Sequence, residues 1–138
     1  MCAELIMRNE PPLTSYLNKM RTSIVRNKSK DFALRIIHLY EYLKEQKREY
    51  VISKQILRSG TSIGANLAEQ EFAISDADYL NKASIALKEA AETDYWLELL
   101  YRAQYLTTTE YNNIHADCDE IIKMLAQTVK TTKEKLNR

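Results

Sequence analysis

Histidine, cysteine and carboxylate side chains could bind a metal ion in this 138-residue chain, but their spacing does not assemble a site. A di-metal centre in a helical bundle uses Glu-x-x-His on two helices. Neither of the two histidines, His38 and His115, has a glutamate three residues before it. His115 and Cys118 have a spacing that zinc can use, yet no second pair of ligands accompanies them. The sequence therefore predicts neither a metal site nor a cofactor.

Nucleophilic and phosphate-transfer chemistry also lacks its usual sequence patterns. The chain contains no G-x-S-x-G, P-loop or G-x-G-x-x-G segment. Small helical ribonucleases place a histidine further beyond an arginine than the three positions that separate Arg35 from His38. We therefore expect no catalytic residues and a protein that is not an enzyme.

Several polar residues recur at helical spacing between residues 58 and 94. Asn66 and Glu69 fall about one turn apart, and Asp94 interrupts an apolar stripe. Buried polar groups need hydrogen-bonding partners. The pattern predicts an internal network that fixes helix register, and a polar ligand pocket is the alternative that the spacing leaves open. The expected members are Arg58, Ser62, Asn66, Glu69, Glu92 and Asp94.

Basic residues are concentrated in the first part of the chain. Residues 1–58 hold 12 Lys and Arg against 6 Asp and Glu, although the net charge of the whole chain is only +1. Rows of such cations bind phosphates without base-specific geometry. Two alternatives involve no nucleic acid. The basic residues could form a solvated helix face, or acidic helices of the same bundle could neutralise their charge. The candidate nucleic-acid-binding residues are Arg21, Arg26, Lys28, Lys30, Lys44, Lys47, Arg48, Lys54 and Arg58.

Composition indicates an all-α domain that positions these residues. Only two glycines and two prolines occur, and the apolar residues recur at helical spacing. We expect an N-terminal extension over residues 1–28 and an antiparallel up-down-up-down four-helix bundle over residues 29–138. The expected helices are 29–47, 53–72, 76–104 and a fourth beginning after Thr107, with Ser29, Ser53 and Ser75 as N-caps.

No segment of the sequence reads as a secretory signal or a membrane span. The two cysteines, Cys2 and Cys118, do not form a spaced disulfide framework. We therefore expect a cytoplasmic protein with reduced thiols and no membrane partner.

Two glycines and three aromatic residues predict contacts between subunits. Gly60 and Gly64 lie four residues apart, hence on one helix face, and each costs a helix about 1 kcal/mol relative to alanine. Such a face suits the close approach of another backbone. Tyr79, Tyr95 and Trp96 lie off the main apolar stripe of their helix and offer apolar area. We expect these five residues to form an oligomer interface.

The run that contains Asn66, Ala68 and Glu69 also carries a family resemblance. Together with Arg58, Ser62 and Ile63, and with Ile85-Ala86-Leu87, Glu92 and Leu97 further on, it is similar to the S23 four-helix-bundle proteins encoded in 23S rRNA intervening sequences. Gln70 stands where many members have glycine. The resemblance implies a homopentameric ring with a central channel. A related branch, the accessory variability protein of diversity-generating retroelements, binds nucleic acid and a reverse transcriptase through a basic surface.

These observations predict a non-enzymatic, oligomeric protein that binds RNA or DNA electrostatically and has a possible protein partner. The alternative is a structural or protein-interaction module with no nucleic-acid role. The two hypotheses differ in whether the basic block between residues 19 and 58 faces phosphates or only solvent.

Overall fold

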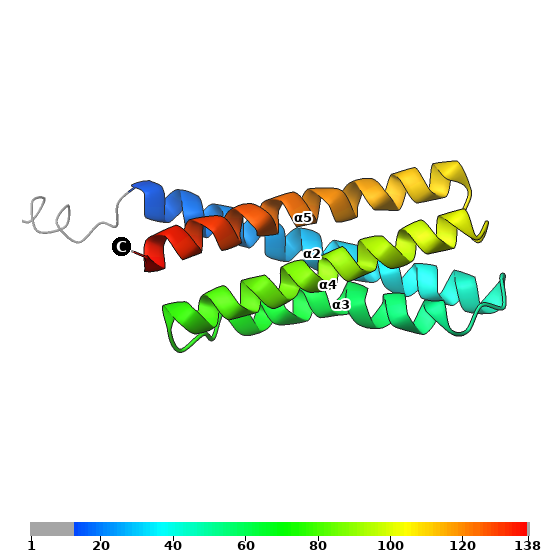
Figure 1. Ribbon diagram of the computed structural model, residues 1–138, viewed down its shortest axis with the longest axis horizontal. Helices are drawn as coiled ribbons and strands as arrows, with labels where there is room; N and C mark the ends of the chain where they lie inside the picture. The colour runs from blue at the N-terminus through cyan, green and yellow to red at the C-terminus, as the bar shows by residue number, and fades with distance from the viewer. Residues whose placement is uncertain (1–12, 138) are drawn as a thin grey trace, which may run out of the picture.

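Four long helices make up the part of the chain that the structure, a computed structural model, describes, namely residues 13–137 (Figure 1). They are α2 (Leu13–Glu45), α3 (Ile52–Gln70), α4 (Asp76–Arg102) and α5 (Thr108–Leu136). No strand occurs in these residues. The expected all-α class is confirmed.

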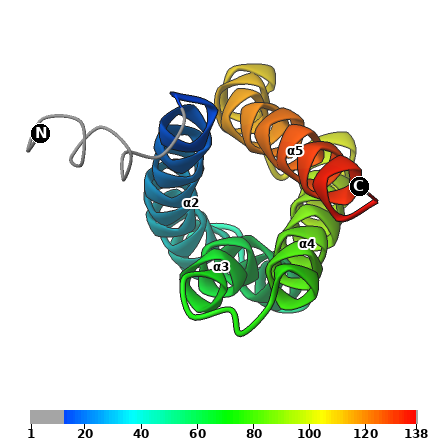
Figure 2. The ribbon, with the colours of Figure 1, turned by 90° about the vertical axis from the view of Figure 1, so that its left-hand side faces the viewer.

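The helices lie side by side along the long axis of the molecule, and α2 packs on α3, α3 on α4 and α4 on α5 (Figure 1). α5 also contacts α2, and the end-on view shows all four around a common interior (Figure 2). The α2–α3 turn (46–51) and the α4–α5 turn (103–107) lie at the same end, which we call the double-turn end (Figure 1). The opposite end holds the α3–α4 turn (71–75), the start of α2 and the end of α5.

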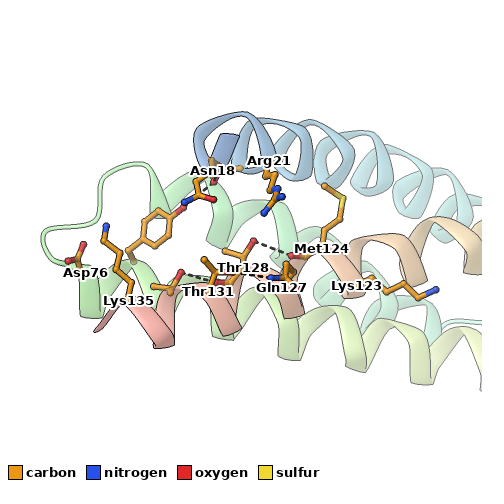
Figure 3. A pocket seen from close by; sticks show the side chains of 12 residues that line it. Asn18, Arg21, Asp76, Lys123, Met124, Gln127, Thr128, Thr131 and Lys135 are labelled. Atoms are coloured by element: carbon orange, nitrogen blue, oxygen red, sulfur yellow. Dashed lines mark hydrogen bonds between the residues drawn. The ribbon is translucent and has the colours of Figure 1, made fainter. Parts of the chain in front are cut away.

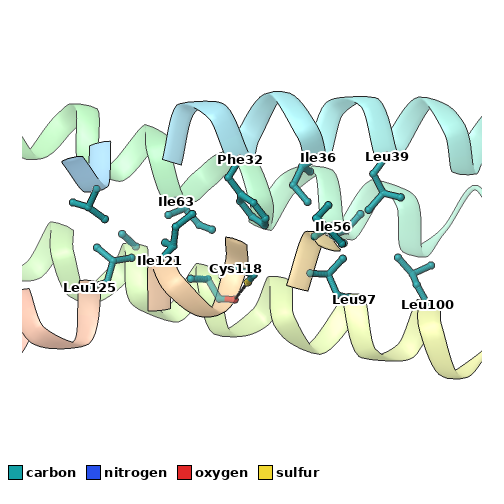
Figure 4. Close-up of a cluster of buried hydrophobic side chains, with 14 of the residues drawn as sticks. Phe32, Ile36, Leu39, Ile56, Ile63, Leu97, Leu100, Cys118, Ile121 and Leu125 are labelled. Carbon is teal, nitrogen blue, oxygen red and sulfur yellow. Dashed lines mark hydrogen bonds between the residues drawn. The ribbon is translucent and has the colours of Figure 1, made fainter. Parts of the chain in front are cut away.

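The interior is filled by apolar side chains that recur three, four or seven residues apart. On α3 they are Ile56, Ile63 and Leu67, and the stripe of α5 runs from Ile114 to Val129. Figure 4 shows them meeting side chains of the other helices along the bundle axis. The largest fully buried apolar side chains include Phe32, Ile36, Leu43, Ile56, Ile63, Leu67, Leu97, Leu100, Ile121 and Leu125.

The start of the first bundle helix differs from the expectation. Ser29 was expected to be an N-cap, but it lies inside α2, which is continuous across residues 28 and 29. The Ser29 hydroxyl is buried and donates to the Val25 carbonyl at 2.7 Å, one helical turn back. Serine can bond in this way within a helix instead of capping one. The expected boundary between an extension (1–28) and a bundle (29–138) therefore does not coincide with a break in structure.

The buried stripe of α4 has Thr93 at the point where the sequence placed Asp94. Asp94 was expected to face inward, whereas Thr93 is fully buried there and Asp94 lies at the edge of the stripe. The Thr93 hydroxyl lies 2.9 Å from that of Ser59 on α3 and 2.8 Å from the Glu89 carbonyl. These contacts satisfy the hydrogen-bonding capacity of the buried Thr93 hydroxyl. The core at this position therefore holds a hydroxyl instead of the expected carboxylate.

One expected N-cap of the later helices is confirmed, and so is the expected start of the fourth helix after Thr107. The Ser75 hydroxyl accepts from the Asp78 N–H at 3.0 Å at the start of α4. Thr107 forms a capping box with Glu110 at the start of α5.

None of the described helices has the length and apolar character needed to cross a membrane. Predictions that concern residues 1–12, including Cys2, lie outside the described residues.

The two glycines of α3 pack against α2 of the same chain. A Cβ on Gly60 would lie 2.8 Å from Cγ1 and Cγ2 of the fully buried Ile36. A Cβ on Gly64 would lie 3.5 Å from the Ser29 carbonyl oxygen, an ordinary contact. The predicted close approach to a backbone is present, but the backbone belongs to α2. The glycine face is thereby covered within the protomer, which corrects the assignment of Gly60 and Gly64 to a subunit interface.

Gly60→Ala is expected to lower the free energy of unfolding by up to about 2 kcal/mol, the overpacking cost less the gain in helix propensity. Overpacking a core costs about 1–3 kcal/mol, whereas alanine improves helix propensity by only about 1 kcal/mol. Gly64→Ala is the matched control, and it should leave stability unchanged or raise it by up to about 1 kcal/mol. Urea unfolding followed by circular dichroism measures both. Equal destabilisation by the two changes would contradict this account.

Candidate nucleic-acid interface

Four of the predicted basic residues gather at the double-turn end. Lys44 is in the last turn of α2, Lys47 and Arg48 form the α2–α3 turn, and Lys54 is in the first turn of α3. Lys47, Arg48 and Lys54 are exposed, and Lys44 is half-buried. None of the four makes an ion pair with another residue of the described chain. We call these four residues the basic turn cluster.

Tyrosines support two members of the basic turn cluster. The Lys44 ammonium lies 5.1 Å from the ring centre of Tyr40, and that of Lys47 lies 5.9 Å from Tyr42. Both distances are within the range of a cation–π contact. This contact holds a lysine near the surface without neutralising its charge.

A buried carboxylate shapes the α2–α3 turn. Glu49 is only 7% exposed, and its two carboxylate oxygens accept from the N–H groups of Val51, Ile52 and Ser53 at 2.5–3.2 Å. Ser53 was expected to cap α3, but α3 begins at Ile52 and the Ser53 hydroxyl donates to the Glu49 carbonyl at 2.8 Å. A carboxylate at a helix N-terminus satisfies the free donors and complements the helix dipole.

Three other predicted basic residues are paired with carboxylates of neighbouring elements. Arg26 lies 3.2 Å from Glu71, and Lys28 lies 2.8 Å from Glu120, whose hydrogen bond raises the pKa of Lys28. Arg58 contacts Glu89 at 3.1 Å and also Glu92. The hydrogen bond to Glu89, followed by that to Glu92, raises the Arg58 pKa. These three cations are compensated within the protomer.

The remaining two predicted basic residues lie on α2 away from the double-turn end. Lys30 is exposed. Arg21 lines a groove of about 530 Å³ between the first half of α2 and the last half of α5. Figure 3 shows Arg21 facing Thr128 and Gln127 of α5, with Lys135 and Asp76 nearer the end of the bundle. Arg21 is therefore separated from the basic turn cluster by most of the length of α2, and Lys30 lies near the middle of that helix.

The members of the predicted polar network fall into three separate sets of contacts, and the largest set links Asn66, Ser62, Arg58 and Glu92. Only Arg58 and Glu92 touch each other through their side chains, and Glu92 also accepts from the Trp96 indole N–H at 3.0 Å. Ser62 and Asn66 bond to backbone carbonyls of their own helix. The other two carboxylates pair elsewhere, Glu69 with Lys82 at 2.6 Å and Asp94 with His115 at 2.8 Å.

The three aromatic residues expected at a subunit interface have different surroundings. Tyr95 is 53% exposed and meets Trp96 edge to face, with ring centres 5.0 Å apart. Trp96 is partly buried against the core of its own protomer. The Tyr79 hydroxyl lies 3.2 Å from that of Thr22 on α2. Of the three, Tyr95 leaves the most ring surface exposed.

A stack of aromatic rings, absent from the predictions above, joins α4 to α5. The rings of Tyr101 and Tyr111 are stacked with centres 4.5 Å apart and an interplanar angle of 8°. Tyr111 stacks in turn on His115, at 5.0 Å and 13°. Burial, followed by the charge of Asp94, raises the Tyr111 pKa. Tyr111 and His115 lie four residues apart on α5, a spacing visible in the sequence, but the contact of Tyr101 with Tyr111 depends on how α4 and α5 pack.

Tyr101 lines a groove of about 590 Å³ between the two turns of the double-turn end, which we call the end groove. Lys47 of the α2–α3 turn lines it from one side, and the α4–α5 turn lines it from the other. The remaining lining residues are Arg102, Gln104, Tyr105, Leu106, Thr107, Thr108 and Glu110. The end groove thus combines cationic, aromatic and hydroxyl groups.

Cys118 has the environment of a core residue. It is fully buried, and its thiol lies 3.5 Å from the Ala90 carbonyl oxygen. Burial, with a smaller effect from Asp94, raises the Cys118 pKa to about 12. The thiolate is the reactive form of cysteine, so Cys118 is a poor nucleophile near neutral pH.

Comparison with known proteins identifies related sequences and a related structure. A family model described as 23S rRNA-intervening sequence protein matches residues 21–127. The fold is similar to the 1.70 Å crystal structure of a protein of unknown function from the S23 ribosomal protein family of Bacteroides thetaiotaomicron VPI-5482. That protein is 54% identical, the match covers 80% of this chain and 98% of the other, and the TM-score is 0.78. No curated protein matches the chain.

Glu49→Ala is expected to lower the free energy of unfolding by about 1–2 kcal/mol, because the first N–H groups of α3 lose their carboxylate acceptor. Glu45→Ala, an exposed glutamate one turn earlier, is the matched control and should change stability by less than about 0.5 kcal/mol. Urea unfolding measures both variants. A Glu49→Ala protein as stable as the control would contradict the capping role.

Proposed function

The chain belongs to the 23S rRNA-intervening sequence protein family, and from this premise we propose that it is a non-enzymatic protein that binds nucleic acid electrostatically. The site of contact is the basic turn cluster at the double-turn end. Phosphate groups bind lysine and arginine by charge and counterion release, which requires no base-specific geometry.

One observation carries the proposal, namely the division of the predicted cations into paired and unpaired groups. Arg26, Lys28 and Arg58 each contact a carboxylate, so binding of a phosphate there would compete with an existing ion pair. The basic turn cluster has no such internal competitor among the described residues. Its cations are also close together at one end of the bundle, where a single phosphate backbone could reach all of them.

We further propose that the protein assembles into a homo-oligomer, with the pentameric ring implied by the family resemblance as the specific expectation. Large apolar side chains are exposed along the start of α2, at spacings of four, three and four residues. They are Leu13, Leu17, Met20 and Ile24, which are 44–74% exposed. Such a stripe is typical of helix–helix association. A ring would present several basic turn clusters to one nucleic acid and would raise avidity.

The runner-up function is a protein-interaction module without a nucleic-acid role. The exposed apolar residues Phe72 and Ile74 at the α3–α4 turn favour it, being 81% and 93% exposed. Pull-down from the native host with and without nuclease separates the two functions. Partners that persist after nuclease treatment support the runner-up.

Replacing Lys44, Lys47 and Lys54 together by glutamine should weaken binding of a 23S ribosomal RNA fragment. The dependence of log K on log salt concentration should become shallower by about 2–3 units, because each lost phosphate contact removes roughly 0.7–0.9. Fluorescence anisotropy across a salt series measures both effects.

The matched control replaces three exposed lysines elsewhere, Lys88, Lys130 and Lys133, by glutamine, and so makes the same change in net charge. It should bind like the wild type. An equal loss in both triple variants would assign binding to net charge alone, and no binding by the wild type at low salt would refute the proposed function.

Light scattering at micromolar concentration should give a mass near five chains. Leu17→Gln with Met20→Gln should reduce that mass, because the change removes apolar area available to a second subunit. Leu34→Gln, at an exposed leucine further along α2 (56% exposed), is the control. A clean monomer of the unaltered protein would refute the ring.

A further inference from the structure

The aromatic stack runs along the bundle from His115 to Tyr101, and Tyr101 lies at the end groove. His115 is the innermost ring, Tyr111 lies one turn closer to the start of α5, and Tyr101 lies in the last turns of α4. Both steps approach the double-turn end, so Tyr101 is the outermost of the three rings. One face of Tyr101 is covered by Tyr111, and Tyr101 is also a lining residue of the end groove.

The last ring of the stack is held in position before any ligand arrives. The hydroxyls of Tyr101 and Thr108 lie 3.1 Å apart, which fixes the ring relative to the first turn of α5. The nearly parallel Tyr101 and Tyr111 rings, with an interplanar angle of 8°, restrict tilting. A preorganised aromatic ring loses little conformational freedom when a planar ligand stacks on it.

Charged groups around the end groove favour a ligand that carries phosphate. Lys47 and Arg102 line the groove, and the Arg102 side chain is 73% exposed. Its contact with Glu98 is long, at 3.7 Å, and lies at the surface, where an ion pair competes weakly. The lining carboxylate, Glu110, already accepts from the Thr107 N–H at 2.8 Å in the capping box of α5.

We propose that the end groove binds an unpaired nucleobase, which stacks on Tyr101 as the next layer of the aromatic stack while Lys47 and Arg102 contact the adjoining phosphates. This inference rests on the proposed nucleic-acid function and narrows it to single-stranded substrates. A volume of about 590 Å³ lies within the range of small-ligand sites. Stacking tolerates every base, so no strong sequence preference follows.

Double-stranded nucleic acid cannot use this site. Its bases are stacked on one another and paired, so their faces are not available to a protein ring without being flipped out. A duplex can still reach the lysines of the basic turn cluster through its phosphates. The proposal therefore predicts a preference for single strands in addition to the electrostatic binding shared by both forms.

The preference is tested by fluorescence anisotropy with a labelled single-stranded RNA of about 20 nucleotides and with the duplex of the same sequence. The unaltered protein should bind the single strand about tenfold more tightly, which is within the range for one stacked base. Tyr101→Leu should weaken single-strand binding about tenfold and leave duplex binding unchanged. Tyr101→Phe should retain the preference, because it keeps the ring.

Tyr95→Leu is the matched control, since Tyr95 is a 53% exposed tyrosine of the same helix that does not line the end groove. It should bind both RNAs as the unaltered protein does. If Tyr101→Leu keeps the single-strand preference, the proposal is overturned. If the unaltered protein binds both forms equally, this inference fails and the proposed function stands, whereas binding of neither form refutes the proposed function itself.

A second measurement does not depend on the folding of a variant. Single-stranded RNA containing 5-bromouracil is irradiated with the unaltered protein, and the crosslinked peptide is identified by mass spectrometry. Crosslinks should fall on Tyr101 or on neighbouring residues of the end groove. Crosslinks confined to helix surfaces outside the end groove would overturn the assignment.

Discussion

The close contact between α2 and α3 is the constraint on which the rest of the structure depends. Without side chains at Gly60 and Gly64, α3 lies directly against Ile36 and against the backbone at Ser29. This contact sets the register of the two helices along most of their shared length. Lys44 at the end of α2 and Lys54 at the start of α3 consequently lie at one end, on either side of a turn that Glu49 holds in shape.

The starts of the later helices could be predicted from the sequence because each cap depends on residues close by in the chain. Predictions were wrong where the role of a residue depends on a contact with a distant helix. Ser75 and Thr107 cap helices through residues only three positions away, so the pattern is visible in a short segment. Ser29 has the same side chain as Ser75, but its role is decided by α3, which buries it. Thr93 rather than Asp94 faces the core because Ser59, on another helix, offers it a partner.

In the candidate site, too, the residue types could be predicted from the sequence, whereas their contacts with other helices could not. The sequence identifies which residues are cationic, but it does not indicate which of them will find a carboxylate. Lys28 is paired by Glu120 and Arg58 by Glu89, and each partner is contributed by a different helix. The aromatic stack was missed because Tyr101 and Tyr111 flank the α4–α5 turn and their rings come together only when the two helices pack.

Because α2 is one long continuous helix, charges at one end of the molecule have little electrostatic effect at the other end. Its 33 residues extend about 50 Å at 1.5 Å per residue, several times the Debye length of about 8–10 Å near physiological ionic strength. Charges at the double-turn end are therefore screened from the apolar start of the same helix. A change of ionic strength therefore alters electrostatic contacts at the basic turn cluster, while hydrophobic contacts made by the exposed apolar stripe at the start of α2 persist.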